Sequence, residues 1–547
     1  MKYNVKVGRK TFEVEDNFID RAVKFIDPNR YAHRLRSRIF GAIVGNYYGA
    51  SKSRRQTSQW NPLDGSPDIT ITYELADLRS RSRDLLRNTP LAAGAINTVC
   101  TNVVGSGLQL QSRIDRSILN ISDDQADEWE NKAELEWALF WDTKEVDLNR
   151  TLNGPGITEL VFRQVLENGD VFVNLPRMTR GFTPYLTRLQ LIEADRVCNS
   201  NSVTDTNELA MGVEKDEYGA PRSYHICNEY PYYNLASNKK AGKKWTVIPA
   251  YSEITALPNI LHVFRPLRPG QSRGLPYLTP VIEQLKQVDR YSEAELMAAV
   301  ISSMLTVFIK TEKGSTDFDT TGLGVETKAT SSDTDVKLAA GAIIDLAQGE
   351  DIAVVDPKRP NTSFDPFVQA VLRQVGVALE IPFEILIKHF TASYSAARAA
   401  LLEAWKFFIS RRVWLAANFI QPVYEIFLYE AISSGRLPAP GYFTNPLIRM
   451  AYSSAEWIGP AAGQIDPVKE ADGAIKRINN GLSTRAKETA ALGGDWDSNI
   501  RQLTKELQQL KNAGMWPPPA NTKTSSFPGN QEGENIDDSE GGDRETT

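Results

Sequence analysis

The sequence has few of the residues on which metal sites and acid–base sites are built. Its 547 residues include three cysteines and four histidines (Cys100, Cys198, Cys227; His33, His225, His262, His389). No Cys-x-x-Cys pair occurs, which argues against structural zinc, and the scattered histidines offer few candidates for metal ligands or proton carriers. We therefore expect no metal and no cofactor, and free thiols typical of a reducing compartment.

Long apolar runs are also missing. The longest one worth testing, 296–309, has 14 residues and contains Ser302, Ser303 and Thr306, so it is too short and too polar to cross a bilayer. With 41% apolar and 24% charged residues, the composition is that of an ordinary folded protein, and the length predicts two to four domains. An integral membrane protein, a collagen and a wholly disordered chain are excluded.

The charge is unevenly distributed, although the net charge is only -6. Residues 1–60 hold 13 Lys or Arg against 5 Asp or Glu, whereas residues 520–547 hold seven acidic groups against Lys523 and Arg544. Charged ends of this kind are usually solvated, and some are interaction tails. We expect a basic N-terminal arm and a disordered acidic tail.

Three short patterns could indicate catalysis, and each has a simpler interpretation. Residues 270–274 match G-x-S-x-G, the nucleophile elbow of serine hydrolases, but three prolines nearby favour a turn that introduces a helix. Glu193 and Asp195 could be paired catalytic carboxylates, but we expect them to close a strand and pair with Arg196. Residues 239–244 lack the glycine spacing of a phosphate-binding loop.

Hydrophobic periodicity predicts a mixed α+β chain with unusually long helices towards its C-terminal half. The helices 280–304 and 365–380 flank a small strand–loop–strand unit, and Pro422 should kink or break a third long helix. The other helices are expected at 18–43, 69–104, 123–140 and 156–167, the third long one at 396–433, and two more within 467–511. Strands are expected at 108–114, 171–175, 185–192, 224–228, 260–264, 305–310, 342–346 and 352–355.

The order of several stretches resembles the portal proteins of tailed bacteriophages, specifically the lambda-like family. The resemblance covers most of residues 30–512, and no single motif decides it. The stretches that carry it are 78–112, 167–175 (ENGDVFVNL), 189–197 (LQLIEADRV), 212–226, 262–282 and 456–485. The stretch 262–282 also includes the hydrolase-like pentapeptide.

The resemblance implies a portal-type subunit with a wing, a long-helix stem, a small α/β clip and a helical crown. Such subunits assemble into a ring, usually of twelve, around a central channel. The expected parts are a basic arm (1–60), an α+β wing (61–275), a first stem helix (279–304), the clip (305–360), a second stem helix (364–380), a tunnel loop (381–397), a long kinked helix (398–433), a wing return (434–465), crown helices (466–516) and a disordered acidic tail (517–547).

The function implied is structural: a ring at one capsid vertex through which double-stranded DNA is packaged and ejected. No catalytic, cofactor or metal residues are expected. The expected partners are double-stranded DNA without sequence preference, further copies of the chain, the terminase large subunit, major capsid or scaffold protein, and head-completion or tail connector proteins, with no membrane. The DNA-facing candidates are Lys388, His389, Thr391 and Ser393; the docking candidates in the clip are Lys310, Lys313, Asp317 and Lys337. The ring would be assembled in the host bacterial cytoplasm and reside in the virion.

Two alternatives from other classes stay open on sequence alone. A serine hydrolase using Ser272 would act as a monomer or dimer. A duplex-DNA-binding protein using the basic arm 1–60 would show steeply salt-dependent affinity.

Overall fold

The computed structural model describes residues 65–230, 244–303, 363–390, 393–463 and 466–515 without interruption. It also describes short segments at 2–7, 10–15, 307–311 and 350–354, and single residues or short stretches within 23–32 and 59–62. The chain divides into two compact units, Met1–Tyr73 and Glu74–Thr547.

The first unit contains an antiparallel hairpin of β1 (Lys2–Val7) and β2 (Lys10–Glu15), followed by the short helix α3 (Pro67–Thr72). Ser66 caps α3 by accepting a hydrogen bond from the amide of Ile69. Only short helical stretches of the helix predicted at 18–43 fall within the described residues, so that prediction stays untested as a whole.

The second unit begins with two helices, α4 (Leu75–Asn88) and α5 (Pro90–Val103), where the sequence predicted one long helix. α4 ends at Thr89, and α5 starts with proline at its first position. The residue before a proline disfavours the helical region, and Thr89 is extended (φ -111°, ψ 110°), so the single helix predicted over 69–104 was wrong. α4, α5 and α8 (Gly154–Asn168) pack against one another.

Small antiparallel sheets accompany these helices. The order β10-β4-β5 joins Ile260–Phe264, Asp170–Asn174 and Gln190–Glu193, and β6-β7-β8-β9 joins Leu209–Ala210, Val213–Lys215, Pro221–Cys227 and Trp245–Pro249. The strand predicted at 185–192 is mostly irregular and becomes regular only in β5. β3 (Gln109–Ser112) pairs with β13 (Ala455–Ile458), which brings a C-terminal segment back to the N-terminal part of this unit.

The main core is aromatic and lies around α7 (Asp123–Trp141). Ser122 and Gln125 form a capping box at the start of this helix, and its apolar stripe of Trp129, Ala133, Trp137 and Phe140 is buried. Trp137 stacks on Trp141 at a centroid distance of 4.7 Å and meets the edge of Phe427 on α13 (Gln421–Ser433) at 5.2 Å. Residues 290 positions apart therefore share one core.

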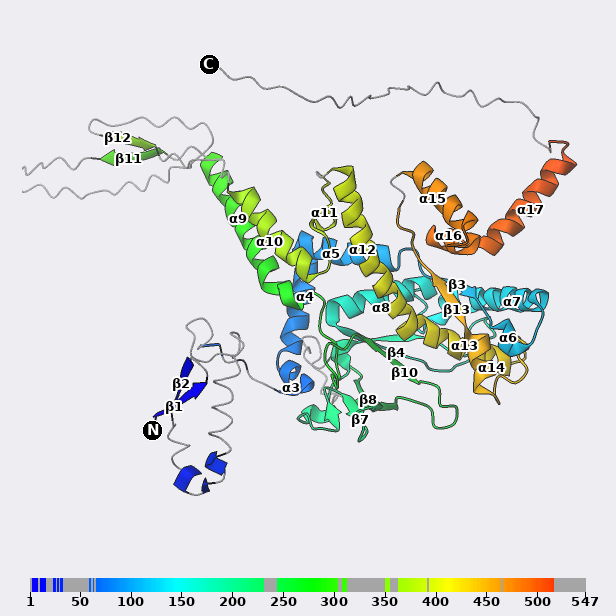
Figure 1. Cartoon of the computed structure of the whole chain (residues 1–547), viewed down its shortest axis with the longest axis horizontal. Helices are drawn as coiled ribbons and strands as arrows, with labels where there is room; N and C mark the ends of the chain where they lie inside the picture. The colour runs from blue at the N-terminus through cyan, green and yellow to red at the C-terminus, as the bar shows by residue number, and fades with distance from the viewer. Residues whose placement is uncertain are drawn as a thin grey trace, which may run out of the picture. The chain divides into compact units, whose positions relative to one another are not determined.

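Two helices form an antiparallel pair that extends from this core (Figure 1). α9 (Ile282–Ser303) buries Leu285 and Val288 near its start, and α10 (Phe364–Ala378) buries Leu372 and Val375 near its end. Tyr291 holds the pair together by contacts with Phe364 and Phe367. Between these helices in the chain, β11 (Val307–Thr311) pairs with β12 (Glu350–Val354). The strand predicted at 342–346 lies outside the described residues.

The third long helix contains a π-helical segment just before its proline. α12 (Tyr394–Leu415) continues through the π-helix Ala416–Ile420 into α13, where Pro422 lies in the first turn. Pro422 has no amide hydrogen to donate to the preceding turn, and the wider π-turn is one way a helix accommodates that loss. The predicted interruption is confirmed as a local widening of the helix.

The described C-terminal part is helical. It begins with α14 (Pro446–Ser453). After residue 466 the structure has three helices, where two were expected: α15 (Pro467–Asn479), α16 (Arg485–Ala491) and α17 (Trp496–Asn512). Overall, the chain is a mixed α+β protein with small antiparallel sheets, as predicted.

Candidate functional site

The pentapeptide 270–274 forms a tight turn between β10 and α9. Gln271 accepts hydrogen bonds from the amides of Leu267 and Arg268 through Oε1 and donates one from Nε2 to the carbonyl of Arg273. Because β10 ends at Phe264 and α9 begins at Ile282, Ser272 does not lie on the sharp strand-to-helix turn that a nucleophile elbow requires. The simpler interpretation, a turn that introduces the long helix, is confirmed.

The residue of this turn with the most contacts is Arg273, which is only 1% exposed. Its Nε donates to Oδ2 of Asp170 at 2.6 Å, and its Nη groups donate to the carbonyls of Ala194, Val197 and Met211. The guanidinium also lies 5.0 Å from the ring centre of Phe172. Every nitrogen of this buried cation therefore has an acceptor.

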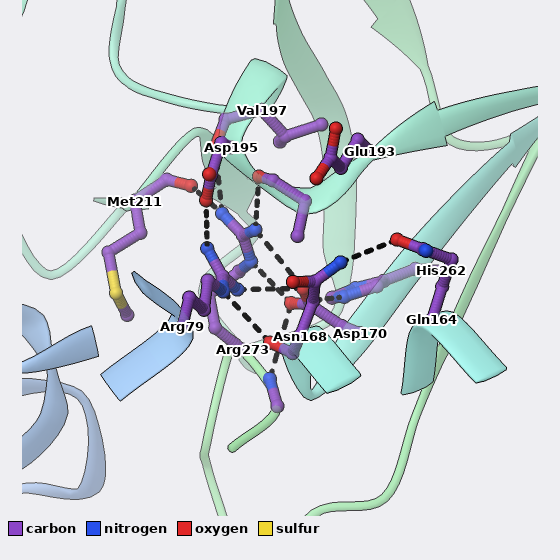
Figure 2. Close-up of polar contacts among 12 residues, drawn as sticks. Arg79, Gln164, Asn168, Asp170, Glu193, Asp195, Val197, Met211, His262 and Arg273 are labelled. Atoms are coloured by element: carbon purple, nitrogen blue, oxygen red, sulfur yellow. Dashed lines mark hydrogen bonds and ion pairs between the residues drawn. The ribbon is translucent and has the colours of Figure 1, made fainter. Parts of the chain in front are cut away.

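Asp170, the first residue of β4, is the centre of a buried cluster (Figure 2). Arg79 of α4 approaches it from a second direction, with Nη2 2.7 Å from Oδ1. His262 of β10 lies with Nε2 3.3 Å from Oδ2, and the amide of Gly274 donates to the same oxygen. One carboxylate thus connects α4, β4, β10 and the segment that leads into α9.

The electrostatics of the cluster favour the charged form of Asp170. Burial would raise the pKa of this carboxyl group, but Arg273 and Arg79 outweigh burial and hold the pKa well below its usual range. Burial lowers the pKa of Arg79 to about 10, against the opposing effect of Asp170, so the guanidinium stays protonated at neutral pH. Burial also lowers the pKa of His262, which favours the neutral imidazole.

The two carboxylates singled out in the sequence belong to the rim of this cluster. Asp195 pairs with Arg83 at 2.6 Å and with Arg79 at 3.4 Å, and Glu193 pairs with Arg83 at 2.9 Å. The predicted pairing of Asp195 with Arg196 was therefore wrong: Arg196 donates from Nε to the carbonyl of Cys227 instead. Sequence reasoning missed Arg79 and Arg273, because nothing local relates them to an aspartate 91 or 103 residues away.

This arrangement is suited to holding elements together rather than to catalysis. A pocket of about 540 Å³ opens beside Ser272 and His262, but the His262 ring is stacked between Phe172 and Phe264 and its Nε2 faces Asp170. In the described part of the chain, no group of three or more His, Cys, Asp or Glu side chains is placed to hold a metal ion. No described helix is long and apolar enough to cross a membrane.

A second candidate site is the predicted tunnel loop, 381–397, within which the structure has the short helix α11 (Phe383–Leu386) and the first turn of α12. The buried side chains of Ile385 and Leu386 anchor α11 in the main core, and Lys388, His389 and Phe390 that follow are exposed. Lys388 has a left-handed backbone (φ 54°), and Ser393 occupies the cap position of α12. Of the four predicted DNA-facing residues, Lys388, His389 and Ser393 are exposed, and Thr391 lies outside the described residues.

The predicted docking residues are mostly beyond what the structure describes. Lys310 lies in β11, opposite Asp351 of β12 in the strand register. Lys313, Asp317 and Lys337 lie outside the described residues.

Comparison with known proteins identifies the chain's relatives. The model of the lambda family of phage portal proteins matches residues 53–412. Portal protein B of Escherichia phage lambda is 27% identical over 504 residues, covering 87% of this chain and 91% of that protein. The portal protein of Escherichia phage N15 is 27% identical over 501 residues, covering 87% and 92%. A probable portal protein of Halomonas phage phiHAP-1 is 23% identical over 477 residues, covering 85% and 87%.

Solved structures of gene transfer agent particles also align with the chain. The neck of an empty particle gives a TM-score of 0.42 at 14% identity, covering 81% of this chain and 99% of the aligned one. A chain of the native virion gives 0.39 at 14% identity, covering 80% and 96%.

Proposed function

The chain belongs to the lambda family of phage portal proteins, and from this premise we propose how its parts conduct DNA. It is a structural component of the virion at the portal vertex, not an enzyme, and its family forms homo-oligomeric rings through which DNA passes. We propose a ring of twelve copies with α9 and α10 as the stem, 305–360 as the clip and 381–397 as the tunnel loop. The observation that carries the proposal is the family match, which runs from residue 53 through most of α12.

The mass of the purified assembly tests this proposal directly. We expect native mass spectrometry to show a closed ring with a mass twelve times the 61.0 kDa of the chain. A count of eleven or thirteen would still establish a ring. A protein that remains monomeric or dimeric at every concentration would contradict the proposal.

The physical argument for the tunnel loop is that a conduit must guide DNA without holding it. A channel lined with many cations would release many counterions and bind phosphates tightly. The described loop offers one exposed lysine, Lys388, next to His389, on a segment anchored by the buried residues of α11. Such sparse contacts suit a DNA backbone that has to slide through the channel.

We expect alanine at both Lys388 and His389 to reduce DNA retention in filled heads. Removing the only lysine of the segment 381–390 weakens the contact with phosphates, so more packaged genomes should leak before the tail joins. The measurement is the fraction of heads that keep full-length DNA after packaging. The matched control is Lys406→Ala, an exposed lysine of α12 outside the loop. Equal retention in all three proteins, with normal rings, would rule out a role of the loop in DNA contact.

We assign the remaining partners by position in the chain. The terminase large subunit and later the head-completion or tail connector proteins would dock on the clip, around Lys310, Lys313, Asp317 and Lys337. Major capsid or scaffold protein would contact the outer wing and the basic arm 1–60. The support for these assignments is the family membership together with the strand pair β11–β12, which lies between the two stem helices in the chain.

A further inference from the structure

α17 presents an apolar seam that the described part of the chain leaves exposed. Its large apolar side chains recur at alternating steps of four and three residues, at Trp496, Ile500, Leu503, Leu507 and Leu510. This spacing is that of a coiled-coil seam. No residue of α17 is buried, and Ile500, Leu503 and Leu510 are 38%, 49% and 38% exposed. The guanidinium of Arg485 on α16 lies 5.6 Å from the ring centre of Trp496, the first member of the seam.

The start of α17 is nevertheless fixed to the body of the protein. Asp495 caps the helix and accepts a hydrogen bond from Gln111 of β3 at 2.7 Å, and Asp497 pairs with Arg113 at 3.5 Å. The helix is therefore held by polar contacts at its first turn and by a hydrogen bond from Arg501 to Asn131 of α7, while its seam stays exposed. A 17-residue helix is marginal on its own, so burial of this seam would add stability that the isolated subunit lacks.

The charges beside the seam indicate what covers it. Glu506 lies on one flank, directly before Leu507, and Lys511 lies on the other, directly after Leu510; both are exposed. In parallel helices these flanking positions face each other five residues apart, so Glu506 of one helix meets Lys511 of the next. In the C-terminal half of α17, Glu506 on one flank and Lys511 on the other thus complement a second copy of the helix, while Asp497 on the Lys511 flank is paired with Arg113 of its own chain.

Because the pair joins one flank of a copy to the opposite flank of the next copy, it can be repeated head-to-tail around a ring. In a ring with rotational symmetry, neighbouring α17 helices run in the same direction, and each copy uses one flank towards each neighbour. We propose that α17 packs against α17 of the two adjacent copies, with the seam buried between them and Glu506 paired with Lys511 of the next subunit. This inference rests on the ring proposed above and adds the surface through which its copies meet.

Chemical cross-linking tests this contact locally. Cysteines are introduced by Glu506→Cys and Lys511→Cys in the full chain, and the ring is treated with a short bis-maleimide. We expect a ladder of covalent multimers beyond the dimer on a denaturing gel, because each copy is linked on both sides. The matched control, Lys505→Cys with Asn512→Cys, places two thiols on the opposite, exposed face of α17 and should remain at the background of the unsubstituted chain.

Each other pattern overturns the inference. Bands that stop at the dimer would mean a two-fold pair rather than a ring contact, and no ladder from an intact ring would mean that another protein covers the seam. The mass of the unsubstituted assembly is measured first. It shows whether the chain forms a ring at all, so a missing ladder from a confirmed ring contradicts only the contact between α17 helices.

A substitution within the seam itself provides a second test, with the same cross-linking as the measurement. In the double-cysteine background, Leu503→Glu should slow formation of the ladder about tenfold, because a charge replaces a leucine that the contact between copies would bury. Gln502→Glu, the same new residue one position away and off the seam, should leave the rate unchanged. α17 has no buried residue, so neither variant disturbs the core. Equal rates in the two variants would overturn the buried seam.

Discussion

Asp170→Asn should lower the free energy of unfolding by about 3–5 kcal/mol, because it removes the only negative charge that touches both Arg79 and Arg273 in the buried cluster. The substitution keeps the size and shape of the side chain, so the loss is electrostatic. Asparagine can accept hydrogen bonds but cannot neutralise two guanidinium groups, of which Arg273 is 1% exposed. Urea unfolding followed by tryptophan fluorescence would measure the difference.

The matched control is Asp77→Asn on α4, where the same change removes an exposed carboxylate 3.9 Å from Arg81. Exposed pairs of this kind contribute about 0–1 kcal/mol, so this variant should unfold close to the unsubstituted protein. If Asp170→Asn were no more destabilised than Asp77→Asn, the negative charge of Asp170 would not be needed to stabilise the buried guanidinium groups of Arg79 and Arg273.

The elements that follow from local pattern could be predicted well. The helix 123–140 and the strand 260–264 depend on neighbouring residues, and the structure has them within a residue or so of the expected positions. The change in the helix next to Pro422 also follows from local chemistry.

The elements that depend on tertiary contacts could not be predicted from the sequence. Residues 185–192 alternate like a strand, yet only β5 pairs regularly, because Tyr185 and Arg188 are buried and engaged with other segments: Tyr185 donates to Glu136 on α7, and Arg188 donates to the carbonyls of Arg180 and Tyr185. The pairing of β3 with β13 joins residues more than 340 positions apart. No periodicity in one segment carries information about such a partner.

The candidate sites divide along the same line. The order of short stretches was enough to identify the family, and the loop containing Lys388 followed from its place between two helices. The buried cluster was hidden, because its members come from α4, β4, β10 and the turn before α9. The G-x-S-x-G pattern in that turn has a structural origin: Gln271 and Arg273 make buried contacts, Gly270 has a left-handed backbone (φ 79°), and Gly274 leaves space for Gly169.

The last of those glycines leads to the second large expected effect. A Cβ added to Gly274 would lie 1.9 Å from the carbonyl oxygen of Gly169, an approach that two backbones cannot relieve by rotating a side chain. Gly169 itself has a left-handed backbone (φ 91°) at the end of α8, so it cannot easily move away. The amide of Gly274 also donates to Asp170, so any shift of the turn disturbs the buried cluster as well.

Gly274→Ala should therefore destabilise the protein by about 3 kcal/mol, measured by the same urea unfolding. Gly94→Ala makes the identical change within α5, where the new methyl group would have no atom within 4 Å. There alanine should stabilise the helix by about 0.5–1 kcal/mol, so the two variants should shift the midpoint in opposite directions. A shift in the same direction for both would mean that the turn can move aside. In that case the close contact with the backbone of Gly169 would not be the reason why position 274 is a glycine.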